Sequence, residues 1–294
     1  MYSIRAAIIG LCLCLLSGCS ALRIGYNQGE TLAWWWIDAY VDFNGEQAPI
    51  VKQAVRQWFV WHRRGQLPDY AALLSTAQAE VLQPLTTARV CRWADDIRAR
   101  IDTSISRAAQ LAAPIVPSLN SPQLAHIEGH FRKVNDEFRE EYLQDSPEAR
   151  LKEGIQRAVE RGEMLYGKLN EEQSRLVAAG MADSPFDAAL WLAERQRRQR
   201  DILQVLRRLS APGGAPLDRA TVVAALQALA VRAQQPSDAY ALYQRRLTDY
   251  NCELAAQLHN TTTAKQRQVA RDRLKGWEED LRSLIAQVPA QAGG

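Results

Sequence analysis

Apolar residues recur every three or four positions along almost the whole chain, and this spacing limits the possible folds more than any other feature. Such a period is typical of amphipathic helices, whereas strands alternate every second residue. Glycine and proline residues fall mainly between the periodic segments, where they end helices. The sequence therefore predicts an all-α fold, either a multi-helix bundle or an elongated helical array.

The segment 47–64 shows the strongest pattern, because two apolar sets interleave along it: Ile50, Ala54, Trp58, Trp61 and Val51, Val55, Phe59. Its apolar face is so wide that we expect this helix to be buried on most sides. Further helices are predicted from Leu67 to Pro84, after a cap at Thr86, from an N-cap at Ser121, over 217–231, from Pro236, and from a capping box at Thr263.

A single helical domain is expected over residues 28–288, with possible seams at the proline-rich stretches 112–120 and 210–216 and a frayed tail at 289–294. Two helix starts resemble each other, at Leu119-Asn120 with Gln123 and at Leu169-Asn170 with Gln173. Capping by asparagine explains both. The pattern is also similar to the Leu-Thr-x-x-Gln signature of small helical periplasmic chaperones.

The first residues have the features of a secretory signal: the basic Arg5, eleven apolar residues at 6–16, and small residues before Cys19. Eleven residues are too few to cross a hydrocarbon layer of about 30 Å as a helix. The run Leu16-Ser17-Gly18-Cys19 resembles the lipobox of bacterial lipoproteins. This resemblance implies cleavage after residue 18, acylation of Cys19, and a flexible tether over residues 19–27.

The expected location follows from this leader. Several acyl chains on Cys19 hold a protein stably on a membrane without spanning it. Ser20 occupies the position at which Asp favours retention in the inner membrane of known lipoproteins, so the resemblance implies the periplasmic face of the outer membrane. With 36 Lys and Arg against 33 Asp and Glu, the chain is nearly neutral, and we expect no nucleic-acid partner.

Only two cysteines, Cys91 and Cys252, follow the lipobox cysteine. A disulfide between them suits an exported protein, because the compartment outside the inner membrane permits such bonds. Two buried free thiols are the alternative.

Five of the eight tryptophans lie between residues 34 and 61. The stretches Tyr26-Asn27-Gln28, Trp34 to Phe43, Trp61 to Arg64 and Leu67 to Tyr70, together with Asn251-Cys252 and Thr262 to Arg267, resemble a family of proteobacterial lipoproteins of unknown function. The resemblance implies a helical lipoprotein and supplies no catalytic residues.

A possible binding surface is expected in this aromatic and acidic region, formed by Trp34, Trp35, Trp36, Asp38, Tyr40, Asp42, His62 and Arg63. Three consecutive tryptophans on a helix span too wide an arc to share one buried face, so at least one indole should be exposed. The carboxylates could instead accept hydrogen bonds from buried indoles or pair with Arg63, Arg64 or Lys52. Glycan binding beside the carboxylates, or an indole at the membrane interface, are further alternatives.

Motifs of common enzymes are missing from the sequence: it has no Gly-x-Ser-x-Gly elbow, phosphate loop or dinucleotide fingerprint. His126 and His130, four residues apart, could share a zinc ion, but the glutamate of helical zinc proteases does not follow His126, and two solvated histidines are favoured. We therefore expect no catalytic residues, no metal and no cofactor.

These observations favour a membrane-anchored, non-catalytic helical protein that binds another envelope protein. The alternatives are a chaperone-like holdase for unfolded clients, or a protein that binds or cleaves peptidoglycan with Asp38 and Asp42, because paired carboxylates can hydrolyse glycosidic bonds.

Overall fold

The computed structural model describes residues 21–144, 146–211, 217–234 and 238–287, and the elements it forms there are all helical, with no strand. The all-α prediction is confirmed. The elements are α2 (Ala21–Asn27), α3 (Gly29–Val41), α4 (Gln47–Trp61), the π-helix η1 (His62–Gln66), α5 (Leu67–Glu80), α6 (Thr87–Ala112), the 3₁₀ turn η2 (Val116–Ser118), α7 (Ser121–Tyr142), α8 (Pro147–Tyr166), α9 (Glu171–Ala182), α10 (Ala188–Leu209), α11 (Arg219–Gln234), α12 (Asp238–Asn260) and α13 (Ala264–Ala286).

The leader 1–18, Cys19 and the tail 289–294 lie outside the described residues, as does most of the proposed seam at 210–216. Residues 21–27, expected in a flexible tether, form α2 instead. Their helix is held against α13 by an ion pair between Arg23 and Asp280, at 3.1 Å. None of the helices in the described part of the chain has the length and apolar character that a membrane span requires.

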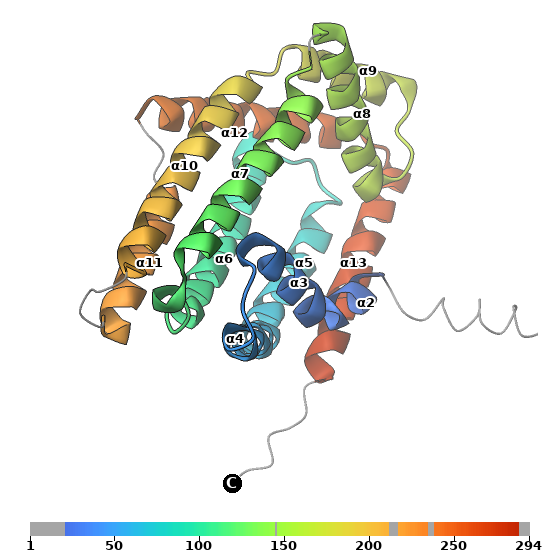
Figure 1. Ribbon diagram of the computed structural model, residues 1–294. Coiled ribbons are helices and arrows are strands. Elements are labelled where there is room, and N and C mark those ends of the chain that lie inside the picture. Colours follow the sequence, from blue (N-terminus) through green and yellow to red (C-terminus); the bar gives the residue numbers. More distant parts are fainter. Residues whose placement is uncertain (1–20, 145, 212–216, 235–237, 288–294) are drawn as a thin grey trace, which may run out of the picture.

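The helices form an open array (Figure 1). On one side α6, α7, α10 and α11 run next to one another, on the other side α5 packs along α13, and α12 crosses above between them. Within the described ranges the buried apolar residues form four clusters, so the core is divided among neighbouring groups of helices, and partly buried residues such as Leu74 and Phe43 each connect two clusters. Cys91 of α6 and Cys252 of α12 are joined by a disulfide with Cα atoms 5.4 Å apart.

Local capping explains where many helices begin. Thr86 accepts a hydrogen bond from the Arg89 N–H, and Thr263 forms the expected capping box with Gln266. Helix α7 begins one residue earlier than predicted, because its N-cap is Asn120 and not Ser121. The asparagine lies in extended backbone with its side chain on the Gln123 N–H, which Ser121, already inside the helix, could not reach.

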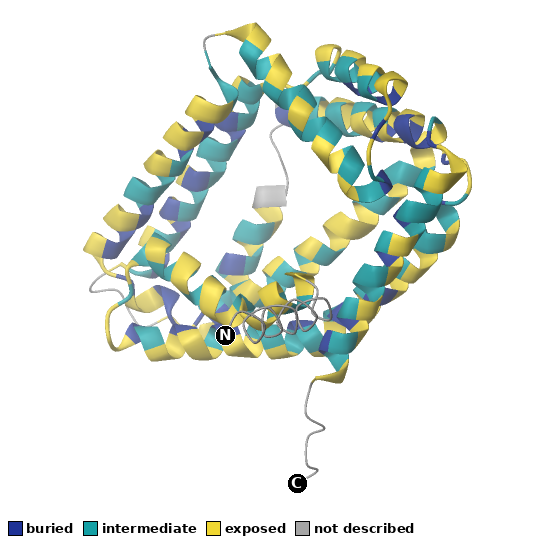
Figure 2. Cartoon of the chain, turned by 90° about the vertical axis from the view of Figure 1, so that its right-hand side faces the viewer, coloured by how far each residue is buried: buried dark blue, intermediate teal, exposed yellow. Residues whose placement is uncertain are grey.

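Helix α4 corrects the expectation of burial on most sides. Val51 and Val55 are buried, but Ile50 and Val60 are exposed, and α4 forms the lower edge of the molecule (Figures 1 and 2). The stretch 112–120 breaks the helical pattern as predicted, yet Ile115 and Val116 lie in an apolar cluster with α4, α10 and α11. This stretch is therefore a packed turn.

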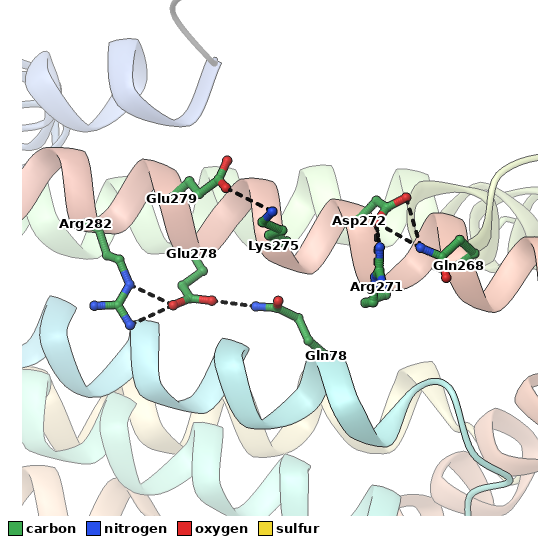
Figure 3. Close-up of polar contacts among 8 residues, drawn as sticks. All are labelled: Gln78, Gln268, Arg271, Asp272, Lys275, Glu278, Glu279 and Arg282. Carbon is green, nitrogen blue, oxygen red and sulfur yellow. Dashed lines mark hydrogen bonds and ion pairs between the residues drawn. The ribbon is translucent and has the colours of Figure 1, made fainter.

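The interface between α5 and α13 contains polar contacts as well as apolar ones (Figure 3). The Gln78 amide of α5 donates to Glu278 of α13 at 2.6 Å, and Arg282 pairs with the same carboxylate at 2.7 Å. These donors hold the pKa of Glu278 below its usual range, with the Gln78 hydrogen bond as the larger cause.

Candidate functional site

Helix α3 has an inner and an outer face, and they divide the three consecutive tryptophans. Trp34 belongs to the inner face together with Ala33 and Ile37, which pack against an apolar cluster. Its ring stacks on Phe43 with centroids 6.0 Å apart, and the Lys52 ammonium lies 4.6 Å from its centroid. Trp34 is thus a core anchor.

The outer face of α3 exposes Leu32, Trp35 and Trp36, a group that we call the Trp face. Their exposed fractions are 51%, 62% and 64%. Spacings of three and four residues place them on one side of the helix, opposite Trp34. Such exposure is unusual for indoles, since tryptophan is highly buried on average.

An aromatic stack extends this surface toward α7. Trp36 lies 4.7 Å from Tyr40, and Tyr40 lies 3.8 Å from His130, measured between ring centroids. His126, one turn earlier on α7, donates through Nε2 to the carbonyl of Ala39 at 3.0 Å. The two histidines therefore hold α7 against α3. The described residues contain no group of three or more His, Cys, Asp or Glu side chains suited to a metal ion.

The two carboxylates of the predicted surface lie at the end of α3. Asp38 Oδ1 accepts a hydrogen bond from the Phe43 N–H at 3.1 Å. Asp42 adopts the left-handed conformation, with φ 59°, and its own N–H donates to the Asp38 carbonyl at 2.7 Å. Asp38 thus terminates the helix, which is a structural use of its carboxylate.

His62 and Arg63 lie in a second aromatic group, formed with Tyr26 and Trp58. The His62 ring stacks on Trp58 at 4.5 Å, and the Tyr26 hydroxyl lies 2.9 Å from His62 Nδ1. Burial lowers the pKa of His62 to about 4 and raises that of Tyr26 to about 12. At neutral pH the imidazole is therefore neutral, and its tautomer decides which of the two groups donates, while Arg63 donates to Asn27 at 3.0 Å.

The structure thus divides the eight predicted surface residues among four settings. Trp35 and Trp36 are on the outer surface with Tyr40 beside them, Trp34 packs against an apolar cluster of the core, Asp38 and Asp42 end α3, and His62 and Arg63 are beside α2. No hydrogen bond or ion pair joins either aspartate to Lys52, Arg63 or Arg64 among the described residues.

Sequence reasoning did not identify a basic surface along α4. Two open hollows border this helix, with volumes of about 620 and 550 Å³, and Arg56 lines both. The second is also lined by Arg64 of η1 and Arg107 of α6. One sequence signal was available: residues 47–66 contain Lys52 and three arginines but no acidic residue.

Comparison with known proteins identifies a family but no activity. A family model described as "Family of unknown function (DUF6279)" matches residues 39–216, which is more than half of the chain. No curated protein and no solved structure matches the chain.

Proposed function

The chain belongs to this family of unknown function, DUF6279, and from its own residues we propose that it is a lipid-anchored, periplasm-facing protein that binds another envelope protein without catalysing a reaction. The proposed location rests on the resemblance of residues 16–19 to a lipobox and on Ser20, which favours the outer membrane.

The exposure of the Trp face is the main observation that supports a binding role. Tryptophan is enriched at the energetic centres of protein interfaces, because its large ring buries much apolar area on docking. Leu32, Trp35 and Trp36 place three large apolar side chains together outside the core. The surface is backed by Trp34, whose packing fixes the helix that presents it.

The position of the Trp face fits an anchored protein. Residues 21–27 and 29–36 are helical, so the distance along the chain from Ala21 to Trp36 is about 23 Å at 1.5 Å per helical residue, and Cys19 lies two positions before Ala21. Leu22 and Ile24 of α2 are exposed as well. A partner docked on the Trp face would therefore contact this protein close to the membrane.

Some of the features that favoured the two alternative functions have structural roles. The Leu-Asn-x-x-Gln starts that pointed to a holdase are both capping boxes whose leucines, Leu119 and Leu169, are buried. Asp38, one of the carboxylates considered for glycan cleavage, accepts a hydrogen bond from the Phe43 N–H at the end of α3.

Crosslinking in cells, followed by capture of the protein from solubilised envelopes and mass spectrometry, tests the proposal. We expect one dominant protein partner for the wild type and its loss in the Trp35→Ala/Trp36→Ala variant. Met164→Ala, which shortens an equally exposed side chain on α8, is the matched control and should keep the partner. The Cys19→Ala variant tests the anchor separately, because it should move the protein from the membrane to the soluble fraction.

Three results would contradict the proposal. Capture of many unrelated unfolded proteins would favour the holdase, capture of muropeptides would favour the glycan reading, and equal capture by the wild type and the double variant would reject the Trp face as the binding surface.

A further inference from the structure

The second hollow beside α4 gathers three arginines that have no acidic partner. Arg56 of α4, Arg64 of η1 and Arg107 of α6 all line it, and among the described residues none of them forms an ion pair. The hollow therefore gathers three positive charges, and none of its lining residues is acidic.

Arg107 is the least exposed of the three, and no carboxylate compensates its charge among the described residues. Its Nη1 donates at 3.0 Å to Gln110, a neutral acceptor, and its Nε is buried without a hydrogen-bond partner in the described structure. A partly buried guanidinium without a counter-charge is unfavourable, because it loses hydration and gains no ion pair. An anion in the hollow would supply the missing interaction.

The walls of the hollow are held in place by contacts that do not involve the arginines. The Trp58 indole of α4 donates to the Ser104 carbonyl of α6 at 3.1 Å, one turn before Arg107. The π-helix η1 places Arg64 and Gly65 at the rim, and π-helical turns occur frequently at functional sites. The three guanidinium groups are thus carried by elements fixed to one another before any ligand binds.

We propose that this hollow is a binding site for a phosphate monoester. Arginine forks match phosphate and carboxylate oxygens alike. Three of them suit a phosphate monoester better, since it carries close to two negative charges and three terminal oxygens, whereas a carboxylate has one charge and two oxygens. Val60 and Trp61 line the same hollow and form an apolar wall for the body of the ester.

This site is separate from the Trp face and does not depend on the lipid anchor. The ester can come from two sources, a soluble molecule or the headgroup of a lipid, and both present the same group to the arginines. The two are distinguished by the probe.

Titration calorimetry of the full chain in zwitterionic detergent tests the proposal, with phenyl phosphate as the soluble probe and micelles doped with phosphatidic acid as the lipid probe. We expect saturable binding of at least one probe that weakens as ionic strength rises. The Arg56→Ala/Arg64→Ala variant alters two exposed side chains, and Arg107→Lys keeps the charge while removing the fork. Each should weaken binding about tenfold or more, because hydrogen bonds to charged groups are among the stronger ones.

Arg98→Ala is the matched control, since it removes an exposed arginine of α6 that does not line the hollow, and it should bind as the wild type does. An effect confined to phenyl phosphate would identify a soluble ester, and one confined to phosphatidic acid would identify a lipid. Absence of binding, or equal binding by the wild type and the arginine variants, would overturn the proposal.

Discussion

Replacing His62 by glutamine should make the stability of the protein less sensitive to acid. His62 is buried between α2 and α4, where it stacks on Trp58 and shares a hydrogen bond with the Tyr26 hydroxyl. Glutamine can form this hydrogen bond in either direction, because its amide both donates and accepts, but it does not titrate. The substitution therefore removes the proton equilibrium while keeping a polar partner for Tyr26.

The sign and size of the effect follow from the lowered pKa. Burial moves the pKa of His62 from 6.5 to about 4 in the folded protein. Well above pH 6.5 His62 is neutral in both states and nothing is lost. As pH is lowered from 6.5 to 4, the unfolded chain binds a proton that the folded chain does not, so stability decreases. The loss amounts to about 2 kcal/mol between pH 7 and pH 5 and approaches about 3 kcal/mol below pH 4.

Urea unfolding at pH 7 and pH 5 measures this difference. The free energy of unfolding of the wild type should fall by about 2 kcal/mol more than that of His62→Gln over this interval. Other titrating groups, including the buried His259, cancel in the comparison. Met164→Ala, which changes an exposed side chain that does not titrate, is the control and should retain the wild-type pH dependence. A His62 proton resonance that titrates near pH 6.5, or equal pH dependence of the two proteins, would refute the reasoning.

Three further predictions concern stability. Reduction of the Cys91–Cys252 disulfide, which spans 161 residues of sequence, should lower the free energy of unfolding by up to about 5 kcal/mol in the chain-entropy model, as measured by urea unfolding with and without dithiothreitol. Gly180→Ala should destabilise the protein by about 1–3 kcal/mol, because the added Cβ would clash with a leucine methyl of α12. Gly276→Ala has open space around it in α13 and should stabilise the protein by up to about 1 kcal/mol. Melting temperatures measured by calorimetry should therefore shift in opposite directions, and a shift of both in the same direction would contradict this. The pKa of Glu278 is lowered in the folded protein, so this carboxylate stabilises the fold above pH 4.5, the ordinary pKa, and the stabilisation is lost as pH falls through the lower pKa of the folded state. The free energy of unfolding of Glu278→Gln should therefore depend less steeply on acid pH than that of the wild type.

The helix starts were predictable because caps act within four residues. Thr86 and Thr263 were identified correctly. For α7 the sequence offered two caps, and the structure confirms Asn120, which forms a capping box with Gln123, and shows that Ser121 was wrong by one residue, because only Asn120 lies in extended backbone. The assignment of the three tryptophans was harder. Helical geometry predicts that they cannot all be buried, but which one faces the core depends on Phe43, Lys52 and the packing of α4.

The basic hollow could not be derived from sequence order alone. Its arginines come from α4, η1 and α6, and residue 107 lies more than forty positions after residue 64. The wide apolar pattern of 47–64 also predicts burial on most sides, which is the opposite of an exposed site on this helix. Val60 is exposed and Trp61 is half-buried, so one side of this helix faces solvent although its residues are apolar.

The two Leu-Asn-x-x-Gln helix starts show how a short sequence similarity can have a structural cause. In both, asparagine caps the helix and the glutamine three residues later is buried, at Gln123 and Gln173. Each glutamine amide then reaches a distant chain carbonyl, Asp42 at 3.0 Å and Thr261 at 3.1 Å.

These carbonyls lie at or just after the ends of α3 and α12, where backbone oxygens have no partner within the helix. Each glutamine also exchanges a hydrogen bond with a second glutamine, Gln47 or Gln266. Each glutamine therefore completes the capping box at the start of one helix and donates a hydrogen bond to a backbone carbonyl at the end of another. The apolar core of the described residues is divided into four clusters, and hydrophobic contact alone would allow neighbouring helices to slide. The buried amides fix the relative positions of these helices, because a displaced amide would leave two buried polar groups unpaired.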